Sequence, residues 1–367
     1  QAPADTAARP AAAAPAAPAA SSDTAAPRPA RARLRILPVF GSAPETGVLG
    51  GLTAFRVFRP GASVRARPST DQFFATVSAR GQVRAFVERD LWLRDDRLRV
   101  NARAEYAHAP QPFYGLGPDA PRAAEEWYTP TTVAGLVAVQ RLVRPGLYAG
   151  LSYELTRTRI RDRARDGALQ AAAAGTGPAL LGAAGSRVAT LEAGLSGDTR
   201  DNLFNPRRGH LVQVTAGVAG GATGSAFPFH RAGVDARLYR ALGARTVLAV
   251  QATAEGVGGR VPFDQLPLAG SPSVLRGYVA GRYRDAALAS AQVEVRRALP
   301  RRFGVAAWGG AGALGPRLGA LRADQLLPTA GAGVRWMLLP RERANLRVDY
   351  GVGRGSRGLY VGFGEAF

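Results

Sequence analysis

The 367-residue chain contains no cysteine, and no lysine occurs among its 48 basic residues. The absence of cysteine excludes disulfide bonds and thiol chemistry. Three histidines remain as candidate zinc ligands, and their spacing is not typical of a zinc site. We therefore expect no metal and no cofactor. No run of 18 or more apolar residues occurs, which excludes a membrane-spanning helix.

Acidic residues are also scarce, since 27 of them face 48 arginines and leave a formal net charge of +21. Such an excess raises the possibility of a nucleic-acid partner. The arginines, however, are spread along the whole chain between apolar residues, and no base-stacking motif is present, so we expect no nucleic acid. Scattered arginines better suit anionic lipid headgroups, because the long stem lies along apolar surface while the guanidinium stays in water. A biased genome composition is the simpler alternative.

Residues 1–32 consist almost entirely of Ala, Pro, Ser, Thr, Asp and Arg. This composition buries too little apolar surface to offset the entropy of ordering. We therefore expect a disordered tail at 1–32 and one folded domain at 33–367. A start at Gln1-Ala2-Pro3, without a basic and apolar leader, is what we expect of an exported protein whose signal peptide has been removed.

From Arg33 onward, apolar and polar residues alternate with a period of two. In 97–107 the even positions are apolar and the odd positions are polar or charged. The same alternation recurs in 147–156, 188–196, 246–255 and 343–352. These runs last about 9–14 residues, which suits membrane-spanning strands better than the shorter strands of soluble sheets. Charged residues in mid-strand, such as Glu154 and Asp349, fit a wet lumen better than the dry core of a sandwich.

The pattern predicts sixteen strands, an even number that places both chain ends on one side. They are expected at 34–41, 48–58, 72–80, 83–92, 97–107, 127–141, 147–160, 187–197, 210–220, 228–241, 246–257, 285–299, 303–312, 329–339, 343–353 and 357–367. Long insertions all fall on one side, at 108–126, 161–186, 258–284 and 313–328. Most turns on the side of the chain ends are short, which is typical of bacterial outer-membrane barrels. The fold class predicted is all-β: a transmembrane antiparallel β-barrel of about 16 strands in the cell outer membrane.

An irregular segment from Val261 to Arg284 precedes the twelfth expected strand. It is rich in Pro and Gly, and its centre reads Leu275-Arg276-Gly277-Tyr278. Irregular segments of this length are uncommon in compact domains unless they have a function. An ordinary surface loop is the alternative.

Four motifs in this chain resemble those of one family. They are Leu275 to Tyr278, Asp198 to Gly209, Phe113 to Gly117 and the terminal Gly362 to Phe367. Together they span nearly the whole chain after about residue 34, and they are similar to the motifs of the BamA/TamA superfamily of outer-membrane assembly barrels, also called bacterial surface antigens. The resemblance implies a barrel that helps insert or translocate proteins or lipids through the seam between its first and last strands.

The resemblance also implies a role for the irregular loop. In the family, this loop folds into the lumen and its Arg contacts acidic residues on the next two strands. Here Glu294 matches the first acidic partner, whereas Gly310 stands where the second is expected. We therefore expect Arg276 to be held by Glu294 together with backbone groups or Tyr278, and Gly277 to let the loop approach the barrel wall.

Two further sets of site residues follow from the resemblance. The turn motif comprises Asp198, Arg200, Asp201, Pro206 and Gly209. This motif is explained as a structural turn that closes the eighth strand onto the ninth. Its Asp and Asn side chains bond to their own backbone, and Asn205-Pro206 begins a turn. The C-terminal strand is expected to face outward through Phe363 and Phe367, as a signal that the assembly machinery reads.

Candidate partners are outer-membrane lipid or lipopolysaccharide, unfolded outer-membrane proteins and a separate periplasmic protein. Family members carry periplasmic domains, which 32 residues of Ala and Pro are too few to encode, so we expect a barrel-only member. A passive pore for small solutes and a structural envelope protein remain as alternatives. We expect no enzyme, because the chain has no Gly-x-Ser-x-Gly elbow, and His108, His210 and His230 lie in different segments without a Ser and Asp beside them.

Overall fold

The computed structural model describes residues 34–43, 46–61 and 66–367. The tail expected at 1–32 lies outside the described residues. Sixteen strands form the wall: β1 (Arg35–Ala43), β2 (Gly47–Phe58), β3 (Ser69–Ser78), β4 (Val83–Leu93), β5 (Leu98–His108), β7 (Glu126–Arg144), β8 (Leu147–Arg161), β9 (Gly185–Asp198), β10 (Gly209–Ala219), β11 (Phe229–Ala241), β12 (Thr246–Gly259), β13 (Ala287–Ala298), β14 (Phe303–Gly315), β15 (Leu327–Leu339), β16 (Ala344–Gly353) and β17 (Ser356–Phe363).

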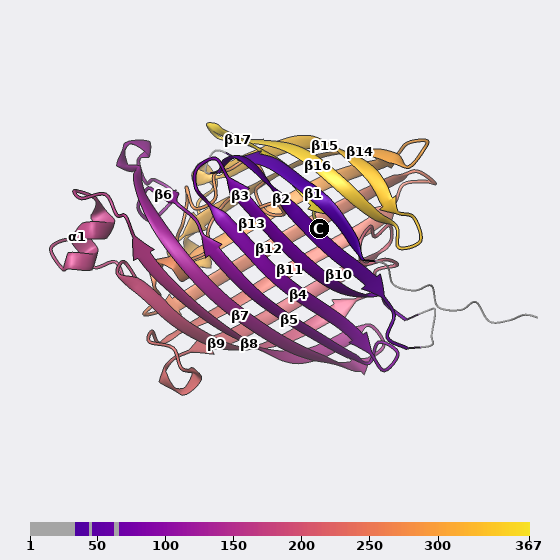
Figure 1. Cartoon of the computed structure of the whole chain (residues 1–367), viewed down its shortest axis with the longest axis horizontal. Coiled ribbons are helices and arrows are strands. Elements are labelled where there is room, and N and C mark those ends of the chain that lie inside the picture. The colour runs from indigo at the N-terminus through magenta and orange to yellow at the C-terminus, as the bar shows by residue number, and fades with distance from the viewer. Residues whose placement is uncertain (1–33, 44–45, 62–65) are drawn as a thin grey trace, which may run out of the picture. The chain divides into compact units, whose positions relative to one another are not determined.

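Each wall strand pairs antiparallel with the next, and β17 returns to β1, so the sheet closes (Figure 1). The predicted sixteen-stranded antiparallel barrel is thereby confirmed. The short strand β6 (Gln111–Phe113) pairs only with β7 and lies within the loop that joins β5 to β7.

The connections differ in length on the two sides of the barrel. On the side opposite the strand ends Arg35 and Phe363, the long connections carry the helix α1 (Ala168–Ala174) and the 3-10 helices η1 (Arg122–Ala124), η2 (Gly221–Thr223), η3 (Phe263–Gln265), η4 (Leu318–Ala320) and η5 (Ala323–Gln325). This loop side, with α1 and β6, lies to the left in Figure 1. Since bacterial barrels have short periplasmic turns and long extracellular loops, the loop side faces the cell exterior. No helix in the described ranges is long and apolar enough to cross a membrane.

The outer wall carries the apolar positions of the alternation. On β8, Leu151 is 58% exposed, and Tyr153 and Leu155 are exposed as well, whereas the intervening Ser152 is half-buried and pairs in register with the lumenal Glu192 of β9. So many exposed apolar side chains would promote aggregation in water, whereas contact with lipid acyl chains is favourable for them.

Replacing Leu151 with arginine should therefore destabilise the barrel in lipid far more than replacing Ser152 with arginine. A lipid-facing arginine near the bilayer midplane costs roughly 2–4 kcal/mol, whereas an arginine at 152 enters a polar lumen beside Glu192. Urea unfolding in lipid vesicles measures the difference. Equal losses of stability for the two neighbours would refute the assigned faces.

The junction between β1 and β17 is the weakest of the wall. Among the described residues, these strands pair only at Ser42↔Leu359. By contrast, β1 pairs with β2 along its full length, and β17 pairs with β16 from Leu346↔Phe363 to Gly353↔Ser356. We call this junction the seam.

Candidate functional site: the lumenal loop and its contacts

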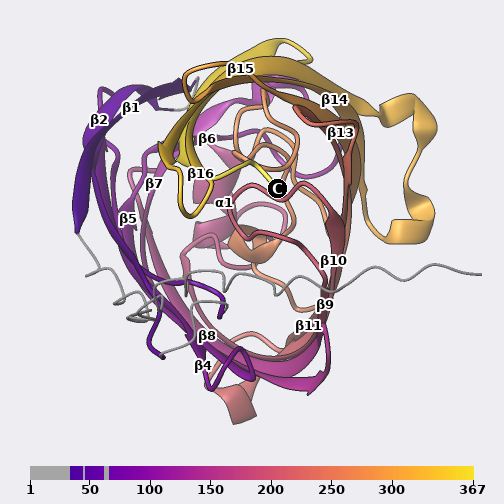
Figure 2. The same ribbon diagram turned by 90° about the vertical axis from the view of Figure 1, so that its right-hand side faces the viewer.

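The connection 260–286 between β12 and β13 runs inside the ring of strands, as the view along the barrel in Figure 2 shows. Its apolar side chains Leu275 and Tyr278 pack in a buried cluster with Leu288, Leu314 and Leu327 of the wall. The prediction of a long loop folding inward before the twelfth strand of the wall, here β13, is confirmed.

Arg276 at the loop tip is fully inaccessible to solvent. Its Nη2 lies 2.7 Å from Glu294 Oε2 on β13, and its Nη1 lies 2.8 Å from Asp349 Oδ2 on β16. The guanidinium carbon sits 3.6 Å from the centre of the Trp308 ring on β14. The loop tip is thus fixed by two charge-assisted hydrogen bonds and one cation–π contact.

The expectation that Arg276 lacks a second carboxylate is wrong, because Asp349 supplies it from β16 instead of β14. Gly310 has a different consequence: a Cβ there would lie 2.7 Å from Gln292 Cβ, so glycine leaves room for Gln292. Gln292 Oε1 accepts a hydrogen bond from Arg276 Nη2 at 3.2 Å. Tyr278 does not stack on Arg276; its hydroxyl donates to the carbonyl of Pro328 at 2.7 Å.

Arg276 belongs to a larger buried network of charges. Its members are the arginines Arg276, Arg296, Arg335 and Arg347 and the carboxylates Glu294, Asp349 and Glu365. Asp349 and Glu294 each contact three of these arginines, and none of the seven side chains is more than 7% exposed. Four positive and three negative groups leave one positive charge in excess, so each carboxylate is needed to compensate the arginines.

The loop tip also binds the last strand. The N–H of Gly277 donates to the hydroxyl of Tyr360 at 2.8 Å, and the Gly277 carbonyl accepts from the Ser356 hydroxyl at 2.6 Å; both partners lie on β17. Gly277 has a φ of 108°, and a Cβ there would lie 2.5 Å from the carbonyl carbon of Val352 on β16. Only glycine fits this approach and this backbone conformation.

Replacing Gly277 with valine should therefore displace the loop tip from β16 and β17. The side chain meets main-chain atoms that cannot move aside, and a β-branched residue at positive φ is strained in addition. Protease sensitivity of the folded barrel should rise at 260–286, as mass spectrometry of limited digests would detect. Gly281→Val is the matched control, because φ is also positive there but the nearest atom is the flexible end of Arg284. A digest pattern identical to wild type would contradict the tight approach.

The turn motif closes β9 onto β10 and also reaches across the mouth of the barrel. Asp198 accepts hydrogen bonds from Arg200 and, at 2.5 Å, from Arg67, which precedes β3. Asp201 accepts from the backbone N–H groups of the turn and from Arg343, which lies between β15 and β16. Burial raises the pKa of the Asp201 carboxyl, but these hydrogen bonds hold the net pKa below its usual value.

The remaining two motif residues support this turn. Pro206 is buried, and Gly209 has a φ of 99° with no room for a Cβ, which would lie 2.3 Å from the Thr199 carbonyl oxygen. The carbonyl of Phe204, inside the same turn, accepts the N–H of Glu365 at 2.9 Å. The turn is therefore joined to the segment that follows the last strand.

The expectation that Phe363 and Phe367 face outward on one strand is wrong. β17 ends at Phe363, and Gly364 takes a φ of 78°, which turns the chain into the barrel. Phe367 is only 4% exposed, and its main-chain oxygen accepts a hydrogen bond from Arg296 Nη2 at 2.8 Å. Phe363 packs on the buried Phe55, with ring centres 4.4 Å apart.

The Phe113 to Gly117 segment covers the lumenal loop from the loop side. The rings of Phe113 and Phe263 lie 5.4 Å apart in a buried cluster, and the N–H of Gly117 donates to the Arg284 carbonyl at 2.8 Å. This segment is therefore part of the packing that keeps the lumenal loop inside.

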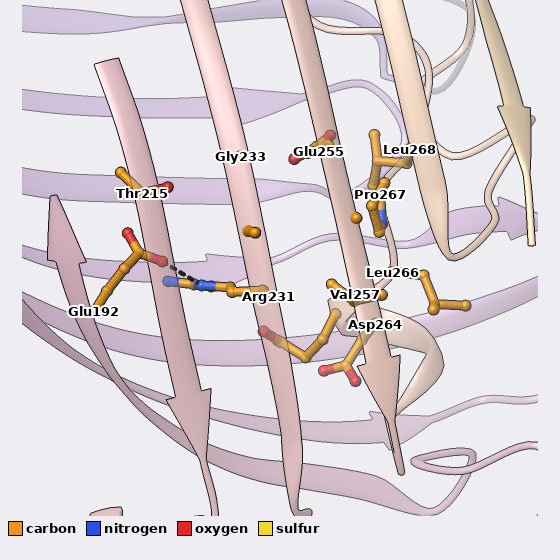
Figure 3. Close-up of a pocket in the computed structure, with 13 residues that line it drawn as sticks. Glu192, Thr215, Arg231, Gly233, Glu255, Val257, Asp264, Leu266, Pro267 and Leu268 are labelled. Atoms are coloured by element: carbon orange, nitrogen blue, oxygen red, sulfur yellow. Dashed lines mark hydrogen bonds and ion pairs between the residues drawn. The ribbon is translucent and has the colours of Figure 1, made fainter. Parts of the chain in front are cut away.

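A polar cavity of about 420 Å³ lies between β9 to β12 and the lumenal loop (Figure 3). Arg231 bonds to Glu192 at 2.6 Å and to Glu154 at 3.0 Å, and Glu255 and Asp264 line the same space. Sequence reasoning missed this cavity, although the strand alternation places Glu192 and Glu255 inward. No group of three His, Cys, Asp or Glu side chains in the described ranges could hold a metal ion.

The closed barrel, its lipid-facing apolar wall and its lumenal loop define an outer-membrane β-barrel protein. Residues 75–367 match the Omp85 superfamily domain, and the chain belongs to that superfamily. A search of curated protein sequences found no significant match.

Solved structures agree with this fold. BamA from Haemophilus ducreyi lacking POTRA domains 1–3 is similar with a TM-score of 0.57 and 12% identity, over 91% of this chain and 70% of that one. CdiB from Escherichia coli has a TM-score of 0.56 and 11% identity, over 90% of this chain. CdiB from Acinetobacter baumannii has a TM-score of 0.53 and 11% identity, over 89% of this chain. The chain spans 62% and 59% of the length of these two CdiB structures.

Proposed function

We propose that this barrel assists the insertion or translocation of proteins at the outer membrane by opening at its seam. The observation that carries the proposal is that the described parts of β1 and β17 share a single residue pair, Ser42↔Leu359. Two strand edges with few mutual hydrogen bonds are a template on which another chain can add a strand. Unfolded outer-membrane proteins are the substrates that such edges fit.

The lumenal loop is the element that would control the seam. Its tip bonds simultaneously to the wall at Glu294 and Asp349 and to β17 through Tyr360 and Ser356. While the loop is in place, β17 is held from the inside of the barrel. Displacement of the loop tip removes these bonds and leaves β17 attached mainly to β16.

The passive-pore alternative has less support. A pore needs an open lumen, whereas here the loop 260–286 packs against the wall from the inside and the turn motif crosses the opposite mouth. A separate periplasmic protein that delivers clients, and membrane lipid as a second substrate, are parts of the proposal that follow from family membership. We propose no catalytic role.

Reconstituted liposomes test the proposal. The purified barrel is placed in vesicles, a urea-unfolded outer-membrane protein is diluted onto them, and its folded fraction is followed over time. We expect folding several-fold faster than in vesicles without protein and in vesicles that hold a porin at equal density. Rates equal to both controls would contradict an insertion role.

A further inference from the structure

A cluster of arginines lies on the outer wall at the loop side of β8 and β9. Arg157, Arg159 and Arg161 follow one another at every second position of β8, and Arg187 lies on β9; all four are exposed. The alternate side chains Thr156, Thr158 and Ile160 are buried. The arginines therefore project away from the barrel interior.

No neighbouring carboxylate compensates this cluster. Arg157 pairs directly with Arg187 in the β8–β9 register, which places two like charges opposite each other. On the other flank, β7 presents Val133 opposite Arg157 and Thr131 opposite Arg159. No ion pair or hydrogen bond to the four guanidiniums occurs within the described ranges, and like charges directly opposite each other destabilise a sheet. The cluster is thus an uncompensated positive patch that an anion would stabilise.

The height of the cluster on the wall indicates where that anion lies. Leu151, Tyr153 and Leu155 precede Arg157 on the same face of β8 and form its lipid-facing band. Two residues of a strand advance about 6.8 Å, so Arg157 stands just above the apolar band. This is the level of the lipid headgroups in the leaflet on the loop side, which is the outer leaflet.

We propose that Arg157, Arg159, Arg161 and Arg187 bind the phosphate groups of a lipid A-type glycolipid of the outer leaflet. Guanidinium groups bind phosphate oxygens in pairs, and four uncompensated charges spread along two strands match a headgroup with more than one phosphate better than a phospholipid with one. The apolar band below accommodates the acyl chains. This inference rests on the membrane position of the wall and is independent of the insertion role.

Native mass spectrometry of the detergent-solubilised full chain, titrated with purified lipid A, tests the proposal. We expect the triple variant Arg157→Gln/Arg159→Gln/Arg187→Gln to bind lipid A at least about tenfold more weakly than wild type, since each arginine near an anionic surface contributes to binding. The matched control is Arg141→Gln/Arg240→Gln/Arg297→Gln, which removes three exposed outward arginines at the opposite rim and should bind as wild type does.

Two further titrations use the unaltered protein, so the test does not depend on folding of the variant. Wild type should prefer lipid A to dephosphorylated lipid A and to phosphatidylglycerol. Equal binding of these three lipids, or equal binding of lipid A by both triple variants and wild type, would overturn the proposed site.

Discussion

Replacing Arg276 with alanine is expected to convert a poorly conducting barrel into a conducting one. The substitution removes both ion pairs and the Trp308 contact that fix the loop tip in the lumen. The loop tip then keeps its apolar contacts and neutral hydrogen bonds, each of which contributes only about 0.5–1.5 kcal/mol. Single-channel recording in planar bilayers should show larger and noisier currents than wild type.

The control for this prediction is Arg260→Ala in the same loop. Arg260 is exposed, and its side chain has no partner within the described ranges. Its removal should leave the conductance at the wild-type level. Unchanged currents in both variants would mean that the loop stays in the lumen without Arg276, and the role of Arg276 in holding the loop would fail.

Replacing Asp349 with alanine is expected to destabilise the barrel more than replacing Arg276 with alanine does. Asp349 contacts Arg276, Arg335 and Arg347, so its loss leaves four buried guanidiniums facing two carboxylates. The expected loss is at least about 3–5 kcal/mol, because several buried charges lose their compensation at once. Arg276→Ala, by contrast, leaves three positive and three negative groups, so it should release the loop at a smaller cost to the wall.

Urea unfolding in lipid vesicles measures this difference. The matched control is Asp235→Ala, which removes a partly exposed lumenal carboxylate whose one ion pair in the described ranges is with Arg237 and which also accepts a hydrogen bond from Gln251. The double variant Arg276→Ala/Asp349→Ala should be more stable than the sum of the single losses predicts, because the two groups interact directly. Strict additivity, or equal losses at 349 and 235, would contradict the network.

The sequence predicted the barrel because the period of two is a local property of each strand. Strand number and the faces of the wall follow from residues within a few positions of one another, whereas the inward folding of the loop is implied by the family resemblance. The second acidic partner of Arg276, on β16, could not be predicted in this way. Asp349 lies 73 positions from Arg276, and only the curvature of the closed barrel brings its inward face to the loop tip. On β14 itself, Arg276 contacts the ring of Trp308, two residues before Gly310.

The end of the last strand was missed for a local reason. In the sequence, the alternation of Leu359 and Phe363 continues through Gly364 to Phe367, but a glycine at positive φ ends the strand there. A hydrogen bond from Arg296 to the main-chain oxygen of Phe367 then holds the segment inside the barrel. No sequence pattern reports such a contact, because Arg296 lies on a distant strand.

A disulfide across the seam tests the proposed function most directly. Ser42 and Leu359 are register partners, opposite residues of antiparallel strands lie about 4.5–5.5 Å apart, and this spacing permits a disulfide. Because the chain has no cysteine, Ser42→Cys/Leu359→Cys creates the only possible bond. We expect the oxidised variant to lose its acceleration of client insertion in liposomes, reductant to restore it, and each single cysteine variant to behave as wild type. Acceleration by the oxidised barrel at the wild-type rate would contradict insertion through the seam.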